Sequence, residues 1–181
     1  MESSLRIGLF GGSFNPVHSG HVGIAERALT ELALDRMLFI PAKVNPFKVD
    51  DGEAVGGLPE PLRWELVRMV CAGRPEFEAW DVDLRRGEGP SYAIDTVRAA
   101  QERFPGAELF WIIGEDNIEG LPRWKDWEEL KTLVRFVPYP RTPESSTEIR
   151  RRLVAGESVA GLVPECVETA LREFLNQEKQ R

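Results

Sequence analysis

The feature that most constrains the fold is a regular alternation between short apolar runs and longer amphipathic stretches. Five runs have the length of buried strands, at residues 5–10, 37–41, 77–84, 108–113 and 134–138. Apolar residues recur at helical spacing over residues 20–34, 59–72, 91–104 and 124–133, and two more helices are predicted at 146–155 and 164–178. Strands separated by helices of this length form βαβ units, so we predict an α/β protein with a doubly wound parallel sheet.

The length and composition fit one domain over residues 1–181, with residues 146–181 as a C-terminal helical segment. The formal net charge of −7 at pH 7 argues against a nucleic-acid-binding face. Apolar runs are too short to span a bilayer, and Cys71 and Cys166 are too far apart for a disulfide framework or a zinc site. We therefore expect a cytoplasmic protein without nucleic-acid or membrane partners.

The 2 histidines of the chain both follow the first predicted strand, in the stretch GGSFNPVHSGH at residues 11–21. In a doubly wound sheet, ligands bind at the carboxyl ends of the strands, where the next helix offers free N–H groups to an anion. His18 and His21 lie three residues apart and therefore share one helix face, while Gly20 between them leaves room for a ligand atom. The stretch has neither G-x-G-x-x-G nor G-K-[ST], which argues against dinucleotide and P-loop chemistry.

Two imidazoles at this position suit a phosphoryl group whose negative charge shifts during a reaction. Two simpler interpretations stay open at this point. One histidine could cap the helix while the other makes an ordinary polar contact, or the two could be a metal pair, for which no third ligand is evident.

A second candidate anion site lies near the end of the chain, in SSTEIRRRL at residues 145–153. Ser145 and Glu148 have the spacing of a capping box, so the helix begins with hydroxyls and open N–H groups. Arg150 lies about one turn further and adds a guanidinium. Arg151 and Arg152 fit a solvated basic face.

GGSFNPVHSGH together with SSTEIR resembles the nucleotidyltransferase superfamily that carries the HxGH signature. RRGEGPSYAIDTV at residues 85–97 and FWIIGEDNIEGLPRWKDWEEL at 110–130 are similar to one branch, the bacterial nicotinate mononucleotide adenylyltransferases. The resemblance implies a Rossmann-like nucleotidyltransferase fold. It also implies transfer of the adenylyl group of ATP to nicotinate mononucleotide by direct in-line attack, giving nicotinate adenine dinucleotide and pyrophosphate in NAD biosynthesis. Mg²⁺ would arrive with ATP, without a dedicated protein metal site, and a homo-oligomer is compatible with the family.

The resemblance also assigns roles to individual residues. The catalytic residues would be His18, His21 and Arg150. The residues that contact ATP would be Gly11, Gly12, Ser13, Phe14, Lys48, Gly114, Asp116, Ser146 and Thr147. The residues that contact the pyridine nucleotide would be Asn15, Tyr92, Ala93 and Trp124, with Trp124 stacking on the ring. Trp64 and Trp80 are predicted to pack, and Arg63 is predicted either to reach the pocket or to lie exposed on its helix.

The sequence departs from the family pattern in two places. Ala93 stands where the family commonly has threonine, which leaves the choice between nicotinate and nicotinamide open. The connection between Val134 and Ser145 is shorter than in the family, which usually has a further strand and helix there. The sheet would therefore have one edge strand fewer than the family. The alternatives are a pantetheine-phosphate adenylyltransferase and a non-catalytic ATP-binding sensor module. A class I aminoacyl-tRNA synthetase has a similar histidine motif, but this chain is short and acidic.

Overall fold

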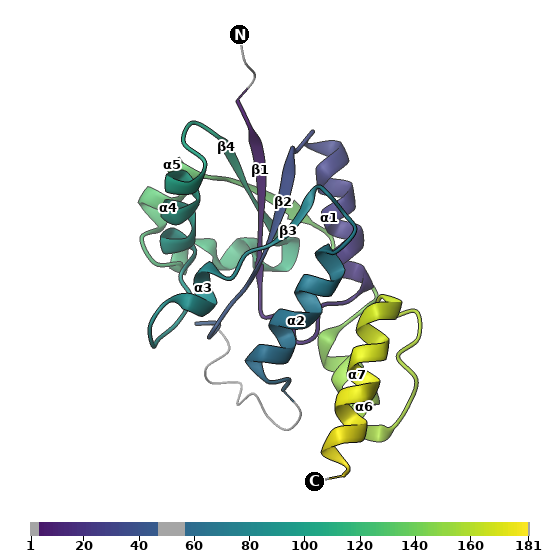
Figure 1. Ribbon diagram of the computed structural model, residues 1–181. Helices are drawn as coiled ribbons and strands as arrows, with labels where there is room; N and C mark the ends of the chain where they lie inside the picture. Colours follow the sequence, from purple (N-terminus) through teal and green to yellow (C-terminus); the bar gives the residue numbers. More distant parts are fainter. Residues whose placement is uncertain (1–3, 47–56, 181) are drawn as a thin grey trace.

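The computed structural model describes residues 4–46 and 57–180, and its centre is a parallel sheet (Figure 1). The sheet has five strands in the order β3-β2-β1-β4-β5. Each neighbouring pair is parallel, as the alternating sequence pattern predicted. The strands are β1 (Arg6–Gly12), β2 (Arg36–Pro41), β3 (Phe77–Ala79), β4 (Glu108–Gly114) and β5 (Arg135–Tyr139).

Helices cover both faces of this sheet (Figure 1). One face is packed by α1 (Ser19–Glu31) and α2 (Glu60–Cys71), and the other by α4 (Ala93–Arg103) and α5 (Trp127–Leu133). From Met37 onward the sequence of β2 is apolar, and the structure shows why. Met37 and Phe39 point into the first of two hydrophobic clusters, whereas Leu38 and Ile40 point into the second. Successive strand residues face opposite sides, so a sheet covered on both faces buries every one of them.

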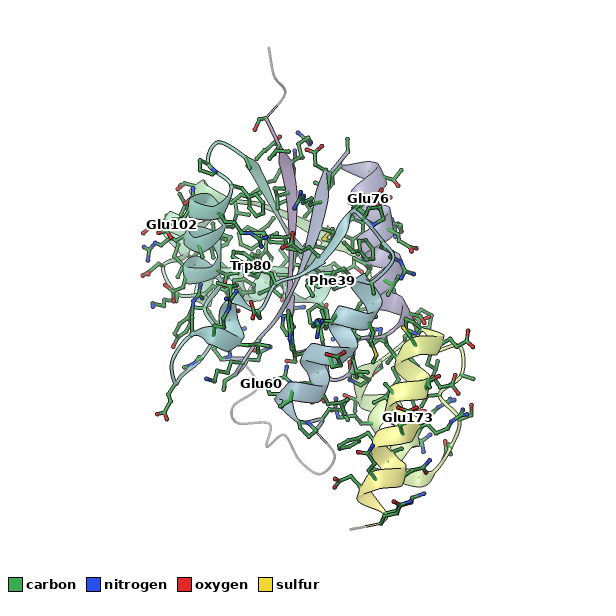
Figure 2. All side chains as sticks on the ribbon, in the orientation of Figure 1. Phe39, Glu60, Glu76, Trp80, Glu102 and Glu173 are labelled. Atoms are coloured by element: carbon green, nitrogen blue, oxygen red, sulfur yellow. The ribbon has the colours of Figure 1, made fainter. Side chains whose placement is uncertain are left out.

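The two clusters are visible as dense side chains on either side of the sheet in Figure 2, where Phe39 belongs to the first and Trp80 to the second. The C-terminal helices α6 (Ser146–Ala155) and α7 (Glu165–Glu178) join the first cluster. Ile149, Val167 and Leu171 are their buried contributions. This packing brings the start of α6 back to the carboxyl end of β1.

Two predicted elements differ from the structure. The strand predicted over residues 77–84 ends at Ala79, and α3 (Val82–Arg85) follows it. The Trp80 N–H donates to the Phe39 carbonyl at 2.9 Å, after which the chain turns and Trp80 packs into the second cluster. The helix predicted over 124–133 begins only at Trp127, after the 3-10 segment η1 (Glu115–Arg123). Pro122 lies inside η1, and Asp126 has φ +53°, so a continuous α-helix cannot begin earlier.

The connection between Val134 and Ser145, noted as short in the sequence, leaves β5 as an edge strand of the sheet. β5 has a partner only in β4 among the described strands, and five residues separate it from Ser145. The chain then enters α6 directly, without a further strand or helix between. The short connection therefore ends beside the β1–α1 turn.

Candidate active site

The two histidines lie together at the N-terminus of α1. Their rings are stacked, with centroids 3.7 Å apart and an interplanar angle of 27°. His18 is the N-cap residue, and its backbone N–H donates to Nδ1 of His21 at 3.2 Å. Because Nδ1 of His21 accepts this bond, the proton of the neutral ring lies on Nε2, which can donate to a ligand.

Burial controls the charge of His18. The side chain is only 6% exposed, and this desolvation lowers its pKa from 6.5 to about 4, against an opposing effect of Glu144. His18 is therefore neutral at pH 7 in the unliganded protein. A phosphate placed beside it would add a negative charge and raise its pKa.

The turn before α1 is shaped by side chains that pack beneath it. Phe14 has φ +44°, a left-handed conformation that is costly for a bulky residue. Its ring is 2% exposed and lies 5.0 Å from the His21 ring, centroid to centroid. Gly11 is required for packing, because a Cβ there would lie 2.8 Å from Cζ2 of Trp111. A Cβ on Gly12 would meet Phe14 only at an ordinary distance of 3.5 Å.

Ser13 and Asn15 differ in what their side chains do. The hydroxyl oxygen of Ser13 is buried and has no hydrogen-bond partner among the described residues, which is unusual for a buried polar atom. The Asn15 side chain, by contrast, is buried and its Oδ1 accepts from the Leu58 N–H at 2.8 Å. Asn15 was predicted to contact the pyridine nucleotide, and this bond ties its side-chain oxygen to the protein.

The second predicted anion motif docks directly onto this turn. Arg150 donates through Nη1 to the Asn15 carbonyl at 2.7 Å, across 135 positions of sequence. The Ser146 hydroxyl donates to the Pro16 carbonyl at 2.9 Å. Ser145 is the N-cap of α6, as the capping box predicted, and accepts from the Glu148 N–H at 3.4 Å. The N-terminus of α6 therefore lies beside the turn that leads into α1.

The other basic residues of this helix have an ordinary role. Arg151 forms ion pairs with Glu148 and Glu157, at 2.8 Å in each case. Arg152 pairs with Glu148, also at 2.8 Å. They belong to an exposed charged face, as predicted. Arg150, in contrast, also lies 3.5 Å from the Thr147 hydroxyl through Nη2, so its guanidinium stays at the N-terminal turn.

Gly114 and Asp116 lie at the carboxyl end of β4, as the motif predicted. A Cβ on Gly114 would be 2.6 Å from Oδ1 of Asp116, so glycine lets the carboxylate fold back toward the strand end. Asp116 is paired with Arg141 of the short connection, whose Nε donates to Oδ2 at 2.8 Å and whose Nη2 contacts the same oxygen. A ribose that binds Asp116 has to share or displace this exposed ion pair.

Tyr92, Ala93 and Trp124 are partly buried and pack against the second hydrophobic cluster. Tyr92 is the N-cap of α4 and Ala93 its first residue. Lys125, next to Trp124, places Nζ 4.6 Å from the centroid of the Tyr92 ring. Trp124 is partly buried and stands edge-on to Trp111, at 5.9 Å between centroids. The structure therefore brings these predicted pyridine contacts into one neighbourhood, while Lys48 lies outside the described residues.

Arg63 is the residue whose position the sequence left undecided. It is 7% exposed, and its Nη1 donates to the carbonyls of Ser13 at 2.6 Å and Ala42 at 3.0 Å. It therefore ties together the segments that follow β1 and β2. A signal existed in the sequence, because position 63 falls on the helical stripe continued by Leu66, Val67 and Val70, all fully buried.

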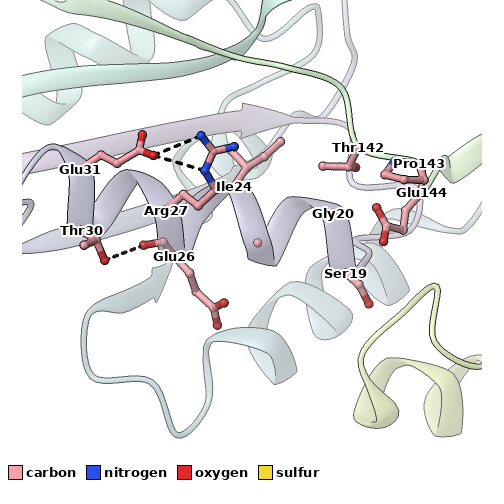
Figure 3. A pocket seen from close by; sticks show the side chains of 11 residues that line it. Ser19, Gly20, Ile24, Glu26, Arg27, Thr30, Glu31, Thr142, Pro143 and Glu144 are labelled. Carbon is pink, nitrogen blue, oxygen red and sulfur yellow. Dashed lines mark hydrogen bonds and ion pairs between the residues drawn. The ribbon is translucent and has the colours of Figure 1, made fainter.

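A groove of about 660 Å³ runs along α1 beside the short connection (Figure 3). Thr142, Pro143 and Glu144 form one wall, close to Gly20. A Cβ on Gly20 would collide with the Thr142 side chain. The room predicted for a ligand atom at Gly20 is thus used by the connection, which packs against the helix. Neither histidine lines the groove, so it lies beside the site.

Two further observations concern metal clusters and membrane-spanning helices. Within residues 4–46 and 57–180 there is no cluster of three or more His, Cys, Asp or Glu side chains able to hold a metal ion. None of the described helices combines the length and apolarity needed to cross a membrane. The site offers imidazoles, hydroxyls, a guanidinium and two helix N-termini, which together suit phosphate groups.

A parallel sheet with these groups at its carboxyl edge defines a class of protein, the nucleotidyltransferases. Residues 9–152 match the family model described as cytidylyltransferase-like. A protein described as "Probable nicotinate-nucleotide adenylyltransferase" from Maridesulfovibrio salexigens is 41% identical over 137 residues, covering 76% of this chain. The chain spans only 61% of the length of that relative.

Other relatives match over nearly their whole length. The nicotinate-nucleotide adenylyltransferase of Bacillus subtilis (strain 168) is 34% identical over 186 residues, covering 93% of this chain and 96% of the relative. This chain therefore belongs to the nicotinate-nucleotide adenylyltransferase family. The fold is also that of Plasmodium falciparum nicotinic acid mononucleotide adenylyltransferase complexed with NaAD, with a TM-score of 0.70 and 12% identity, covering 94% of this chain and 96% of that one.

Proposed function

We propose that this protein transfers the adenylyl group of ATP to nicotinate mononucleotide, producing nicotinate adenine dinucleotide and pyrophosphate in NAD biosynthesis. The observation that carries the proposal is the docking of Ser146 and Arg150 onto the carbonyls of Asn15 and Pro16, beside the stacked histidines. Two anion-binding helix ends that meet at one point can hold a polyphosphate chain. The assignment of nicotinate mononucleotide as the acceptor rests on membership of the family.

We divide the candidate site into two parts. The phosphate half comprises the β1–α1 turn and the start of α6, with His18, His21, Ser146, Thr147 and Arg150. The pyridine half comprises the start of α4 and the segment after η1, with Tyr92, Ala93 and Trp124. Backbone groups of Gly11, Gly12, Ser13 and Phe14 lie between these parts in our proposal, and Gly114 and Asp116 receive the adenosine.

The reaction needs no protein nucleophile. A phosphate oxygen of the mononucleotide forms a bond to the α-phosphorus of ATP while the bond from that phosphorus to the bridging oxygen of pyrophosphate breaks. His21, through Nε2, and His18, whose ring is stacked on it, would contact the phosphates of ATP and stabilise the charge on the transferred phosphorus. Arg150, Ser146 and Thr147 would bind the β- and γ-phosphates and stabilise the charge that develops on the leaving group. Mg²⁺, brought with ATP, would neutralise part of the phosphate charge.

The whole chain is proposed to act as a single domain, because residues of α6 and α7 share the first hydrophobic cluster with α1 and α2. Cys71 and Cys166 are both free, which fits a cytoplasmic enzyme. Lys48 and Asn15 remain proposed contacts of ATP and of the pyridine nucleotide, respectively. The backbone carbonyl of Asn15 already accepts a hydrogen bond from Arg150.

The test is pyrophosphate release from ATP and Mg²⁺, with nicotinate mononucleotide, nicotinamide mononucleotide or phosphopantetheine supplied in separate reactions. We expect release with the nicotinate compound, and the ratio to the nicotinamide compound measures what Ala93 leaves open. Release with phosphopantetheine alone would replace the proposed acceptor. No release with any acceptor, from protein that still binds ATP, would indicate the sensor module instead.

A further inference from the structure

A buried carboxylate lies outside the residues assigned to the reaction. Asp83, in the short helix α3, is 6% exposed, and Thr96 of α4 is fully buried beside it. The Thr96 hydroxyl donates to Oδ1 of Asp83 at 2.7 Å, and Arg86 donates to the same oxygen through Nη1 at 3.1 Å. Burial raises the pKa of the Asp83 carboxyl, while its bonds with Thr96, Arg86 and Ser91 act in the opposite direction.

This cluster is connected to the carboxyl end of β2. The Ser91 hydroxyl, which also bonds Asp83, accepts from the Lys43 N–H at 2.9 Å, and the Ser91 N–H donates to the Val44 carbonyl at 2.9 Å. At the other end of the same loop, Nζ of Lys43 donates to the Arg86 carbonyl at 3.2 Å. Residues 86–91 are therefore anchored at both ends, and at each end by Asp83 and by the segment after β2.

The cluster lies next to the pyridine half in the sequence. Tyr92 and Ala93 follow Ser91 directly, and they are two of the three residues of the pyridine half. Tyr92 makes no side-chain hydrogen bond as the N-cap of α4, so capping does not position the start of that helix. The bond from Thr96, in the first turn of α4, to Asp83 does so instead. A buried carboxylate is costly, and a well-packed apolar residue would serve stability as well.

We propose that Asp83 is a positioning residue for the pyridine nucleotide: through Thr96 and Ser91 it fixes Tyr92 and Ala93 at the edge of the site. This inference rests on the proposed function. It goes beyond that function because it makes the affinity for nicotinate mononucleotide depend on Asp83, a residue that does not contact this substrate. The phosphate half is held by other bonds, so the affinity for ATP does not depend on Asp83.

The experiment compares steady-state kinetics of Asp83→Asn and Thr96→Val with the unchanged protein, varying each substrate in turn. Asp83→Asn keeps the shape and removes the charge, whereas Thr96→Val removes only the hydroxyl. We expect KM for nicotinate mononucleotide to rise about tenfold in both variants, because Asp83→Asn removes the charge that strengthens the hydrogen bond from Thr96 and Thr96→Val removes the bond itself. KM for ATP should change by less than about twofold, a split that general loss of stability does not produce.

Thr96→Ser restores the hydroxyl and should return KM to within about twofold of the original value. Glu129→Gln is the matched control, since it breaks an exposed ion pair with Arg98 of the same helix, at 2.7 Å, and should leave both KM values unchanged. Equal rises in both KM values, or none, would overturn the inference. If Asp83→Asn does not fold, the two Thr96 variants decide. An inactive unchanged protein would instead refute the proposed function.

Discussion

The phosphate half of the candidate site is joined by bonds to main-chain carbonyls, whereas the pyridine half is joined by side chains. Arg150 and Ser146 reach the carbonyls of Asn15 and Pro16, which any sequence at those positions would supply. Tyr92 and Ala93 depend on the side chains of Asp83, Thr96 and Ser91, and Trp124 on its aromatic neighbours. The acceptors of the phosphate half therefore do not depend on the side chains at positions 15 and 16, whereas the position of Tyr92 and Ala93 depends on the side chains of other residues.

This difference suits two tasks. The phosphates of ATP are the same in every adenylyl transfer, so a rigid backbone-based site can be kept while other parts change. The acceptor distinguishes one enzyme from another, and its half of the site is built from exchangeable side chains. Catalysis should therefore fail on changes in the phosphate half, and substrate preference should shift on changes in the pyridine half.

The largest expected effect is on the histidines. His18→Ala and His21→Ala should each lower kcat by about 10²–10³, because each removes a group placed beside the developing charge. Circular dichroism should show an unchanged fold. Full turnover by both variants in the pyrophosphate assay would end the assignment of catalysis to the phosphate half.

The next effect is on stability at acid pH. His18 has a pKa of about 4 in the folded protein against 6.5 in the unfolded chain. Between these values the unfolded chain binds the extra proton, so the stability present above pH 6.5 falls as the pH drops to 4 and this group adds no further loss below. The difference amounts to about 3 kcal/mol.

Urea unfolding between pH 7 and pH 4 measures this loss. The matched variant His18→Asn can still cap α1 but cannot titrate, so it should lose about 3 kcal/mol less than the unchanged protein over the same range. The titration of the His18 ring by NMR gives the pKa directly, and ATP should raise it. Parallel pH curves for the two proteins would contradict a buried neutral His18.

A smaller effect is expected at Arg150. Arg150→Lys keeps the charge but loses the planar fork that reaches both the Asn15 carbonyl and a phosphate, so KM for ATP should rise about tenfold. Arg151→Lys is the control on the same helix, because Arg151 pairs only with exposed glutamates in the described residues. Equal KM values for the two variants would mean that Arg150 does not touch ATP.

The sequence predicted the phosphate half better than the pyridine half, and the reason is physical. The spacing of His18 and His21 and the capping box at Ser145 are local patterns, and both appear in the structure. The bond from Arg150 to Asn15 spans 135 positions, so no local pattern contains it. Family resemblance was needed to place the two motifs together.

The pyridine half depends on details that periodicity does not encode. The alternating residues 77–84 predicted one strand, but the chain turns at Trp80 and buries Asp83 in α3. The alternation over residues 77–84 does not predict that Asp83 is buried, because its burial follows from the turn at Trp80 and from α3. The burial of Arg63 was not predicted either, because arginine on a helix is usually exposed. Its place on an apolar stripe was the available clue.

The smallest expected effect sharpens the comparison within the pyridine half itself. Trp124→Leu should raise KM for nicotinate mononucleotide about fivefold, the value of one aromatic stack, and leave KM for ATP unchanged. Trp127 lies 5.2 Å from the Phe136 ring, centroid to centroid, and is predicted to pack only. Trp127→Leu should therefore lower the melting temperature without changing either KM. If the two variants exchange these results, the stacking residue is Trp127, and the pyridine ring binds nearer to β5 than proposed here.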